Sequence, residues 1–280
     1  MPESAGTLYI VATPIGNLDD LSPRARRILS EVDVILCEDT RHTGQMLQRL
    51  GIGTRRLSLH EHNEARRVAE VVDGLAAGRN YALVSDAGTP LISDPGYRLL
   101  RASRDAGLPV SPVPGPCAAV AALSVAGLPT DRFCFEGFLP ARATARRTRL
   151  EQLAGEPRTL ILYETGRRIR DTLRDCISVF GGDRPAAVAR ELTKAFESVY
   201  RDSLAGLAAR FEGDPDTTRG ECVLVVGGGS RPPTAGPAPE QTMRALLEVL
   251  PASTAARLVT RLYDVPRREA YDLALRLADD

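Results

Sequence analysis

Short apolar runs rich in β-branched residues alternate with amphipathic stretches through the first 115 residues. The runs cover residues 8–13, 33–39, 56–60, 81–86 and 109–115. This alternation is typical of βαβ units, in which a crossover helix joins parallel strands. Helix signals agree, since Ser22-Pro23 is typical of an N-cap followed by proline, and Gly51, Gly78 and Gly107 occupy C-cap places. The sequence therefore predicts an α/β fold with a mostly parallel sheet.

A second set of strand-like runs follows a proline-rich turn at residues 112–116. The small-residue run after this turn predicts a closely packed helix, and further strands are expected at 133–138, 159–164, 186–191 and 221–228. Residues 227–240 are rich in Gly and Pro, which is typical of a linker, and helical patterns follow them. We therefore expect an N-terminal α/β domain over residues 1–114, a C-terminal α/β domain over 115–230, a linker over 231–239 and a helical extension over 240–280.

Composition excludes several classes of protein. With 43% hydrophobic residues, the chain is too apolar to be disordered. No apolar stretch reaches the ~18 residues that span a bilayer, and the N-terminus lacks signal-peptide features, so we expect a cytoplasmic protein that contacts no membrane. The five cysteines are never spaced C-x-x-C, which argues against a disulfide framework or a zinc site. Basic and acidic residues balance at 36 each, so bulk charge does not attract nucleic acid.

Three loops rich in Gly, Pro and small polar residues follow predicted strands. They cover residues 13–20, 85–96 and 112–119, and open α/β sheets bind ligands at such carboxyl ends of strands. Each loop alone is equally well explained as a tight turn, but three together favour a binding site. The motifs G-x-G-x-x-G, G-x-x-x-x-G-K-[ST] and G-x-S-x-G are all absent from the sequence. Dinucleotide-dependent dehydrogenases, P-loop NTPases and α/β-hydrolases therefore lose support.

Several segments together resemble one known family. The segments TPIGNL, CEDTRHTG, LHEHNE, SDAGTPLISDPG, PGPCAA, DRFCFEGFLP, LYET and ARELTKAFE occur in this order. They resemble the ribosomal RNA small subunit methyltransferase I family of the tetrapyrrole-methylase superfamily. The resemblance implies two α/β domains that flank a cofactor cleft, and a homodimer. It further implies methyl transfer from S-adenosylmethionine to the ribose 2′-oxygen of a cytidine in the decoding region of bacterial 16S rRNA, in naked rRNA or in the small ribosomal subunit.

The resemblance also implies which residues contact the cofactor. A glycine-aspartate-proline loop usually holds it in the superfamily, and here Gly88, Thr89 and Pro90 stand in that place, so threonine replaces the aspartate. Asp86 and Asp94 flank the loop, and which of the three takes the aspartate's role stays open. The implied cofactor contacts are Pro14, Gly16, Asp86, Gly88, Thr89, Pro90, Cys117, Ala118, Glu164, Leu192 and Glu221.

Two histidine-containing segments are candidate RNA contacts. In residues 37–44, Asp39, Arg41 and His42 follow a predicted strand, and the planar arginine fork suits phosphate. The alternative is structural, with Thr40 as an N-cap and Asp39 as a first-turn charge. In residues 59–64, His60 and His62 face the same way if the strand continues, and Asn63 is a candidate cap of the next helix. Two histidines without a third ligand make a metal site a weak alternative to a substrate-binding loop, and we expect no metal.

The chain contains a single lysine, Lys194, which follows a predicted strand. A ribose hydroxyl is a poor nucleophile, so the enzyme must align it and help to remove its proton. Lys194 would lower the pKa of the hydroxyl electrostatically, or act as a base if its own pKa were depressed, and Glu191 is an alternative base. A plain surface lysine is the structural alternative.

Residues 141–174 form a candidate RNA surface. This segment carries nine arginines against four acidic residues, a net charge of +5, and includes Arg146 and Arg147. A solvated helix face is the equally simple alternative. Two further functions stay open: a methylase of the same fold that acts on a tetrapyrrole or a modified protein side chain, and a ribosome-associated RNA-binding protein without catalysis.

Overall fold

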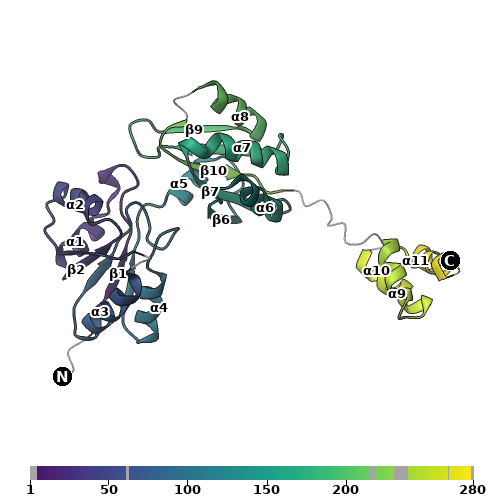
Figure 1. Ribbon diagram of the computed structural model, residues 1–280, viewed down its shortest axis with the longest axis horizontal. Helices are drawn as coiled ribbons and strands as arrows, with labels where there is room; N and C mark the ends of the chain where they lie inside the picture. The colour runs from purple at the N-terminus through teal and green to yellow at the C-terminus, as the bar shows by residue number, and fades with distance from the viewer. Residues whose placement is uncertain (1–4, 61–62, 215–217, 230–238, 264, 279–280) are drawn as a thin grey trace. The chain divides into compact units, whose positions relative to one another are not determined.

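The computed structural model describes residues 5–60, 63–214, 218–229, 239–263 and 265–278 (Figure 1). The chain divides into two compact units, residues 1–229 and residues 230–280. The domain boundaries expected from the sequence within the first unit stay a prediction, and almost all of the expected linker, 231–239, lies outside the described residues.

The first sheet is built from five parallel strands in the order β3-β2-β4-β1-β5, as the alternating pattern predicts. The strands are β1 (Leu8–Val11), β2 (Val34–Cys37), β3 (Arg56–Ser58), β4 (Tyr81–Leu83) and β5 (Val110–Val113). They end two or three residues before the predicted ends at 13, 39, 60, 86 and 115, because the last residues of the apolar runs already belong to loops. These loops leave the carboxyl edge of the sheet.

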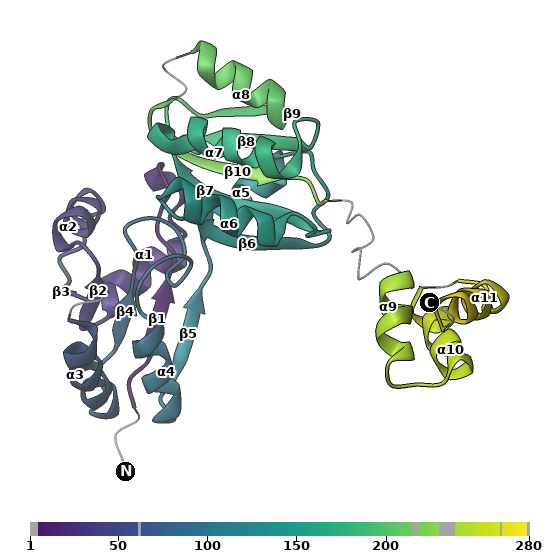
Figure 2. The ribbon, with the colours of Figure 1, turned by 45° about the vertical axis from the view of Figure 1, so that its right-hand side comes forward.

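Helices cover both faces of this sheet. The short helix η1 (Leu18–Asp20) precedes α1 (Pro23–Glu31), and α1 and α2 (Thr40–Arg49) pack on one face. α3 (Glu64–Ala76) and α4 (Tyr97–Asp105) pack on the other face (Figure 2). The predicted caps are confirmed: the Ser22 hydroxyl accepts a hydrogen bond from Ala25 N, and Gly51, Gly78 and Gly107 have φ of 71°, 87° and 69°.

The second sheet has the order β6-β7-β10-β8-β9. Its strands are β6 (Phe133–Phe138), β7 (Thr159–Thr165), β8 (Pro185–Arg190), β9 (Ser198–Ser203) and β10 (Glu221–Val226). Only β6 and β7 pair in parallel, and the other three pairs are antiparallel. The sequence did not predict β9, an edge strand of polar and half-exposed residues that lacks an apolar run.

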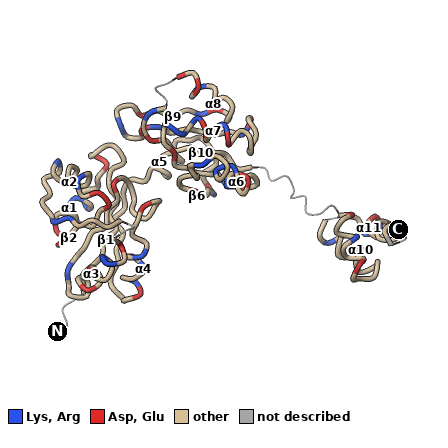
Figure 3. The backbone as a smooth tube through the Cα atoms, in the orientation of Figure 1, with Lys and Arg blue, Asp and Glu red and all other residues tan. Residues whose placement is uncertain are grey.

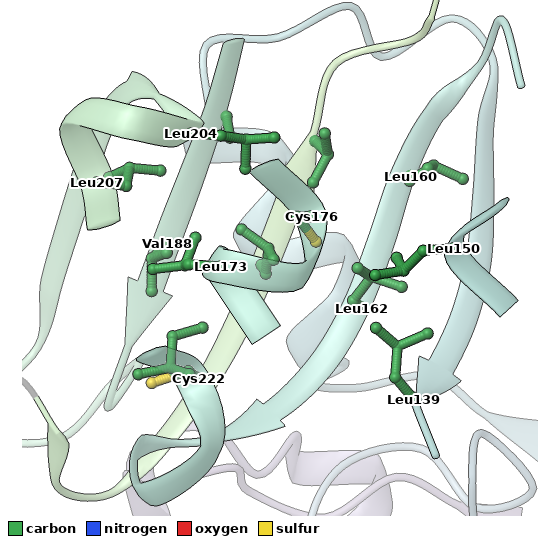
Figure 4. Close-up of a cluster of buried hydrophobic side chains, with 14 of the residues drawn as sticks. Leu139, Leu150, Leu160, Leu162, Leu173, Cys176, Val188, Leu204, Leu207 and Cys222 are labelled. Carbon is green, nitrogen blue, oxygen red and sulfur yellow. The ribbon is translucent and has the colours of Figure 1, made fainter. Parts of the chain in front are cut away.

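Two layers of helices cover the second sheet as well. α5 (Ala118–Val125) packs on one face, as the small-residue run predicts. α6 (Ala143–Leu153), α7 (Gly166–Phe180) and α8 (Leu204–Gly213) pack on the other. Figure 4 shows Leu150, Leu173 and Leu207 from these helices pointing toward Leu162 and Val188 of the sheet. Burial of each such leucine contributes about 1.5–3 kcal/mol.

Residues 230–280 contain the expected helical extension. Its helices are α9 (Pro239–Leu247), α10 (Ala252–Tyr263) and α11 (Arg267–Ala278). They enclose a small core of Met243, Ala255, Ala256, Val259, Ala270 and Ala274. In the part of the chain that the structure describes, no helix is both long and apolar enough to span a membrane.

Candidate active site

The three loops rich in Gly and Pro meet at the carboxyl edge of the first sheet. Thr13 N donates to Gly88 O at 2.8 Å, and Gly88 N donates to Thr13 O at 3.1 Å. The Thr89 hydroxyl donates to Pro116 O at 2.9 Å and so joins the second loop to the third. Gly88 needs a left-handed φ of 82°, which glycine adopts without strain. The structure thus brings together loops that are separated in sequence by about 25 to 75 residues.

A cavity of about 330 Å³ lies between these loops and the second sheet. Its residues from the first sheet's loops are Ile15, Glu38, Asp86, Ala87, Gly88, Thr89, Ile92, Ser93 and Asp94. Those from the second half are Ala118, Phe138, Tyr163, Glu164, Thr165, Ala189, Leu192, Lys194, Glu221, Cys222 and Val223. Both sheets therefore contribute to one concave site, which is typical of a small-molecule pocket.

Most of the cofactor contacts expected from the sequence line this cavity. Seven of them do: Asp86, Gly88, Thr89, Ala118, Glu164, Leu192 and Glu221. Pro14, Gly16, Pro90 and Cys117 are neighbours in sequence of lining residues but are not themselves part of the lining. Gly16 instead packs against the loop that carries Lys194, where an added Cβ would lie 2.5 Å from Lys194 Cγ. What these residues bind stays a prediction.

Carboxylates outnumber basic groups in the cavity. Glu38, Asp86, Asp94, Glu164 and Glu221 line it together with one lysine. The carboxylate of Glu164 is fully engaged, because Oε2 accepts from the Thr172 hydroxyl at 2.6 Å and Oε1 accepts from Thr165 N at 2.9 Å. The other carboxylates leave the cavity with an excess of negative charge, which favours a cationic ligand.

The pKa of Asp94 is raised by its surroundings in the cavity. Burial, and then the nearby Glu38 carboxylate, raise the pKa of Asp94 to about 6, against a hydrogen bond with Ser85 that lowers it. Two residues beside Asp94, Leu91 and Ser93, have left-handed φ values of 74° and 68°. Such backbone costs about 1–3 kcal/mol per residue, persists only where its surroundings fix it, and occurs mostly at functional sites.

Thr89, Asp86 and Asp94 are the candidates to replace the aspartate of the superfamily's cofactor loop, and they differ in their contacts. The Thr89 hydroxyl is used in the bond to Pro116 O, so it fixes the loop. Asp86 Oδ1 accepts from Asp39 N at 3.3 Å and thus links two loops. Asp94 lines the cavity with a carboxylate that burial destabilises, so it is the group best placed to respond to a cation.

Lys194 lines the cavity and is held by two carboxylates. Its Nζ donates to Glu191 Oε1 at 2.9 Å and to Glu221 Oε2 at 2.8 Å. Burial opposes the charge on Lys194, but the hydrogen bonds to Glu221 and Glu191 prevail and raise its pKa. A lysine base requires the opposite shift, so this environment favours the protonated form of Lys194, and its role in the reaction stays a prediction.

Glu191 supports Lys194 from outside the cavity. It is not among the lining residues, and its Oε1 also accepts from Glu221 N at 2.9 Å. Burial works against the Glu191 carboxylate, yet the hydrogen bonds from Glu221 N and Lys194 lower its pKa. A stabilised carboxylate outside the cavity is suited to positioning Lys194, and Glu191 as a base stays an untested prediction. Glu191 and Thr193 adopt left-handed φ of 50° and 65°.

Asp39, Arg41 and His42 lie at the start of α2. Asp39, and not Thr40, is the N-cap, since its Oδ1 accepts from Arg41 N at 2.7 Å and from His42 N at 3.4 Å. The Arg41 side chain is 92% exposed. The His42 Nε2 atom lies 3.1 Å from Asp86 O, so this helix start borders the loop that lines the cavity.

The loop after β3 differs from the prediction. The strand ends at Ser58, so the histidines do not continue along it, and His62 lies outside the described residues. Asn63 stands at the N-cap position of α3, but its side chain does not cap the helix. Its Oδ1 instead accepts from His60 N at 2.9 Å, which closes the loop. Among the residues that the structure describes, no group of three His, Cys, Asp or Glu side chains is arranged to hold a metal ion.

The arginine-rich segment 141–174 is largely neutralised in the structure. Arg146 is only 4% exposed and its Nε donates to Asp175 at 2.7 Å, which corrects its assignment as an RNA contact, since a buried, paired side chain does not reach a phosphate. Arg147 is exposed but shares the same aspartate. Arg149 and Arg174 pair with acids outside the segment. Figure 3 shows acidic and basic residues interspersed along these helices.

A groove beside α2 contains two arginines, Arg41, whose Nε lies 3.8 Å from Asp39 Oδ1, and Arg56. Thr40, Arg41, Gly44, Gln45, Gln48, Ile52 and Arg56 line it. The Arg56 guanidinium carbon lies only 3.3 Å from where a Cβ on Gly44 would stand. Arg56 has no ion pair with any residue in the described part of the chain, and none of the lining residues is acidic. No local pattern distinguishes Arg56 in the sequence, because it is one of 35 arginines.

Comparisons with known proteins agree on one family. The family model of the Tetrapyrrole (Corrin/Porphyrin) Methylases matches residues 7–208. A model described as the RsmI C-terminal HTH domain matches residues 233–278. The ribosomal RNA small subunit methyltransferase I of Xylella fastidiosa (strain Temecula1) is 53% identical over 95% of this chain and 98% of that protein. The protein of the same name from Escherichia coli O157:H7 is 48% identical over 97% and 96%.

Solved structures share the fold at low sequence identity. The methyltransferase CobJ superimposes with a TM-score of 0.59 at 20% identity and covers 80% of this chain and 95% of its own. Uroporphyrin-III C-methyl transferase from Thermus thermophilus, complexed with S-adenyl homocysteine, gives a TM-score of 0.55 at 19% identity. It covers 79% of this chain and 97% of that chain. The two-sheet α/β architecture predicted from the sequence is therefore confirmed.

Proposed function

The chain belongs to the tetrapyrrole (corrin/porphyrin) methylases, and within them to the ribosomal RNA small subunit methyltransferase I proteins, and we propose that its methyl acceptor is a cytidine in the decoding region of bacterial 16S rRNA. It is an S-adenosylmethionine-dependent enzyme that methylates the ribose 2′-oxygen of ribosomal RNA. We place it in the cytoplasm as a homodimer. The observation that carries the assignment is the acidic cavity between the two sheets, with one fixed lysine at its wall.

The residues of the cavity fit S-adenosylmethionine. This cofactor is a cation at sulfur, and Asp94 is a half-buried carboxylate whose pKa is raised by burial and by the nearby Glu38 carboxylate, so a cation beside it would be favoured. Asp86, Asp94, the Gly88–Thr89 turn and Ala118 would hold it, and Gly88 lets the backbone approach closely. When bound, S-adenosylmethionine supplies a methyl group on a positively charged sulfur. The remaining expected contacts, Pro14, Gly16, Pro90 and Cys117, would act by shaping the loops.

Lys194 supplies a fixed positive charge for the acceptor hydroxyl. Because its pKa is raised, Lys194 stays protonated at neutral pH and favours the anionic form of a hydroxyl placed beside it. Glu191 and Glu221 fix its position, so little reorganisation is needed when charge develops on the oxygen. The proton of the hydroxyl leaves to a neighbouring carboxylate or to solvent.

The distribution of charge favours different places for the ribose and for the phosphates of the RNA. Phosphates are disfavoured inside a cavity that contains several carboxylates, whereas a neutral ribose enters it without that penalty. Arg41, Arg56 and Gln45 of the groove beside α2 suit phosphate oxygens, and His42 connects this groove to the loop that lines the cavity. His60, Asn63 and Arg147 remain proposed peripheral contacts.

Methyl transfer to ribosomal particles tests the proposal. Radiolabelled S-adenosylmethionine is incubated with small subunits, or with naked 16S rRNA, from a strain that lacks the enzyme, and the label is mapped by nuclease digestion and mass spectrometry. We expect label on one ribose in the decoding region. Label on a base, or only on a porphyrin-like compound, contradicts the proposal. Comparison of particles with naked rRNA identifies the substrate form, and sedimentation tests the dimer.

A further inference from the structure

Phe138 is an exposed aromatic residue at the edge of the cavity. It ends β6, it is among the residues that line the cavity, and yet 54% of its surface is exposed. An exposed phenylalanine forfeits much of the free energy that its burial would contribute. None of the proposed contacts to cofactor and phosphate involves Phe138, so its exposed ring is available to contact another part of the substrate.

The backbone on both sides of Phe138 is fixed. Gly137 has a left-handed φ of 65° at a shift in the β6–β7 register, and a Cβ there would lie 2.8 Å from Ser93 Oγ. Leu139 is 3% exposed and lies in the core of the second sheet (Figure 4). Arg168 donates from Nη2 to Leu139 O at 2.7 Å. The exposed ring therefore belongs to a rigid strand end that is anchored against both a core and the opposite loop.

Neighbouring aromatic rings fix the orientation of the Phe138 ring. The ring of Tyr163 lies 5.6 Å from that of Phe138 at an interplanar angle of 64° and packs against Phe135 at 4.9 Å. The Tyr163 hydroxyl accepts a hydrogen bond from Ala119 N at 3.2 Å, which holds it at the start of α5. Such edge-to-face contacts order the rings without covering both faces. The cavity edge thus presents a preformed aromatic surface.

The chemistry of the ligand follows from the charges nearby. A flat, uncharged π-system gains from stacking on a phenyl ring, whereas a phosphate is opposed by Glu38, Asp86 and Asp94 on the other wall. Proteins that recognise unpaired RNA bases stack them on aromatic side chains, and enzymes that do chemistry on a base take it out of its stack. We propose that Phe138 stacks on the base of the target nucleotide and so directs its ribose into the cavity. This inference rests on the proposed function.

Three variants separate stacking from mere apolar volume. Phe138→Leu keeps a large apolar side chain but removes the π-face, and Phe138→Tyr keeps the ring. Phe133→Leu is the matched control, because Phe133 is 42% exposed at the other end of the same strand and does not line the cavity. Each variant is compared with wild-type protein for kcat/KM on small subunits, for S-adenosylmethionine affinity by calorimetry, and for sedimentation.

A binding readout accompanies the kinetics. An RNA fragment with a fluorescent cytidine analogue at the target position is titrated with protein saturated with S-adenosylhomocysteine, since stacking on an aromatic ring changes the fluorescence. We expect Phe138→Leu to lose roughly 10- to 100-fold in kcat/KM for RNA and to abolish the fluorescence change. Phe138→Tyr and Phe133→Leu should stay within about threefold of wild type, and the affinity for S-adenosylmethionine should be unchanged throughout.

The outcomes distinguish the inference from the proposed function. If wild-type protein methylates no ribosomal RNA, the proposed function fails and the inference fails with it. If wild type is active and Phe138→Leu matches it in kinetics and fluorescence, the inference alone is overturned. A loss of S-adenosylmethionine affinity in Phe138→Leu assigns the ring to the adenine of the cofactor, and dissociation into monomers assigns it to a subunit interface. Either result also overturns the inference.

Discussion

Replacing Asp94 by asparagine tests the electrostatics of the cavity through protein stability. Burial and then Glu38 raise the pKa of Asp94 from an ordinary 3.8 to about 6 in the folded protein. The folded state therefore holds this proton more tightly than the unfolded chain does. The stabilisation from the protonated group is fully present below the unfolded pKa and is lost as the pH rises through about 6. Above that pH, the native protein contains a carboxylate that its surroundings disfavour.

The magnitude follows from the two pKa values. The shift from 3.8 to about 6 is about two units, which corresponds to about 3 kcal/mol. Asp94 is only half-buried, so solvent screening reduces the effect to about 1.5–2 kcal/mol. Asparagine has nearly the same shape and no charge. Part of this effect already arises between pH 3.8 and pH 4.5, so relative to wild type Asp94→Asn should gain about 1 kcal/mol in the free energy of unfolding between pH 4.5 and pH 7.5.

Urea unfolding of the unliganded protein at several pH values between 4.5 and 7.5 measures this difference. Asp131→Asn is the matched control, because Asp131 is exposed and lies outside the cavity. Its difference from wild type should not change by more than about 0.5 kcal/mol with pH. A constant difference between Asp94→Asn and wild type across this range would refute the reasoning. The same pH dependence in the Asp131 control would also refute it, since the effect would then not come from the cavity.

Three further predictions concern residues around the site. Lys194→Met should lower kcat about 100-fold, because Lys194 acts on the acceptor oxygen in the proposed reaction. The affinity for S-adenosylmethionine, measured by calorimetry, should change little. An unchanged kcat would remove Lys194 from the mechanism. Gly16→Ala should lower kcat about 10- to 100-fold by displacing Lys194, whereas Gly53→Ala, which has open space around it, should not. Arg146→Ala should lower the free energy of unfolding, measured by urea denaturation, by about 3–5 kcal/mol. Arg147→Ala should lower it by about 1 kcal/mol or less, because only Arg146 is buried. Equal losses in the two variants would contradict this reasoning.

The first sheet was predictable because its signals are local. Most of its strands are apolar runs followed by a turn, and several helix ends carry a local signal, such as Ser22 at the start of α1 and Gly51 after α2. The second sheet depends on pairing between distant segments. The sequence of β9 is mostly polar, with half-buried and exposed residues on both faces, so it becomes a strand only because β8 offers it an edge. No local pattern contains that information.

The positions of the loops that form the site were predictable from the sequence, but the roles of their side chains were not. Loops rich in Gly and Pro identify where a ligand is bound, and the rarity of lysine drew attention to Lys194. The roles of individual side chains depend on neighbours that are far away in sequence. Lys194 has a raised pKa because its Nζ donates to a second carboxylate, that of Glu221, 27 residues later in the chain. Phe138 was not predicted, because an apolar residue at the end of a strand usually belongs to the core.

The arginines explain why charge counted along the sequence did not predict the RNA surface. The excess of positive charge in residues 141–174 largely disappears, because Glu136, Asp175 and Glu212 from outside the segment pair with its arginines. Arg56, by contrast, stands in no basic run, yet it lies in a groove without acidic lining residues. A phosphate responds to the field at its own position, which is set by side chains from several elements. Under the proposed function, the field that would orient the RNA is therefore the contrast between this groove and the acidic cavity, and folding creates both.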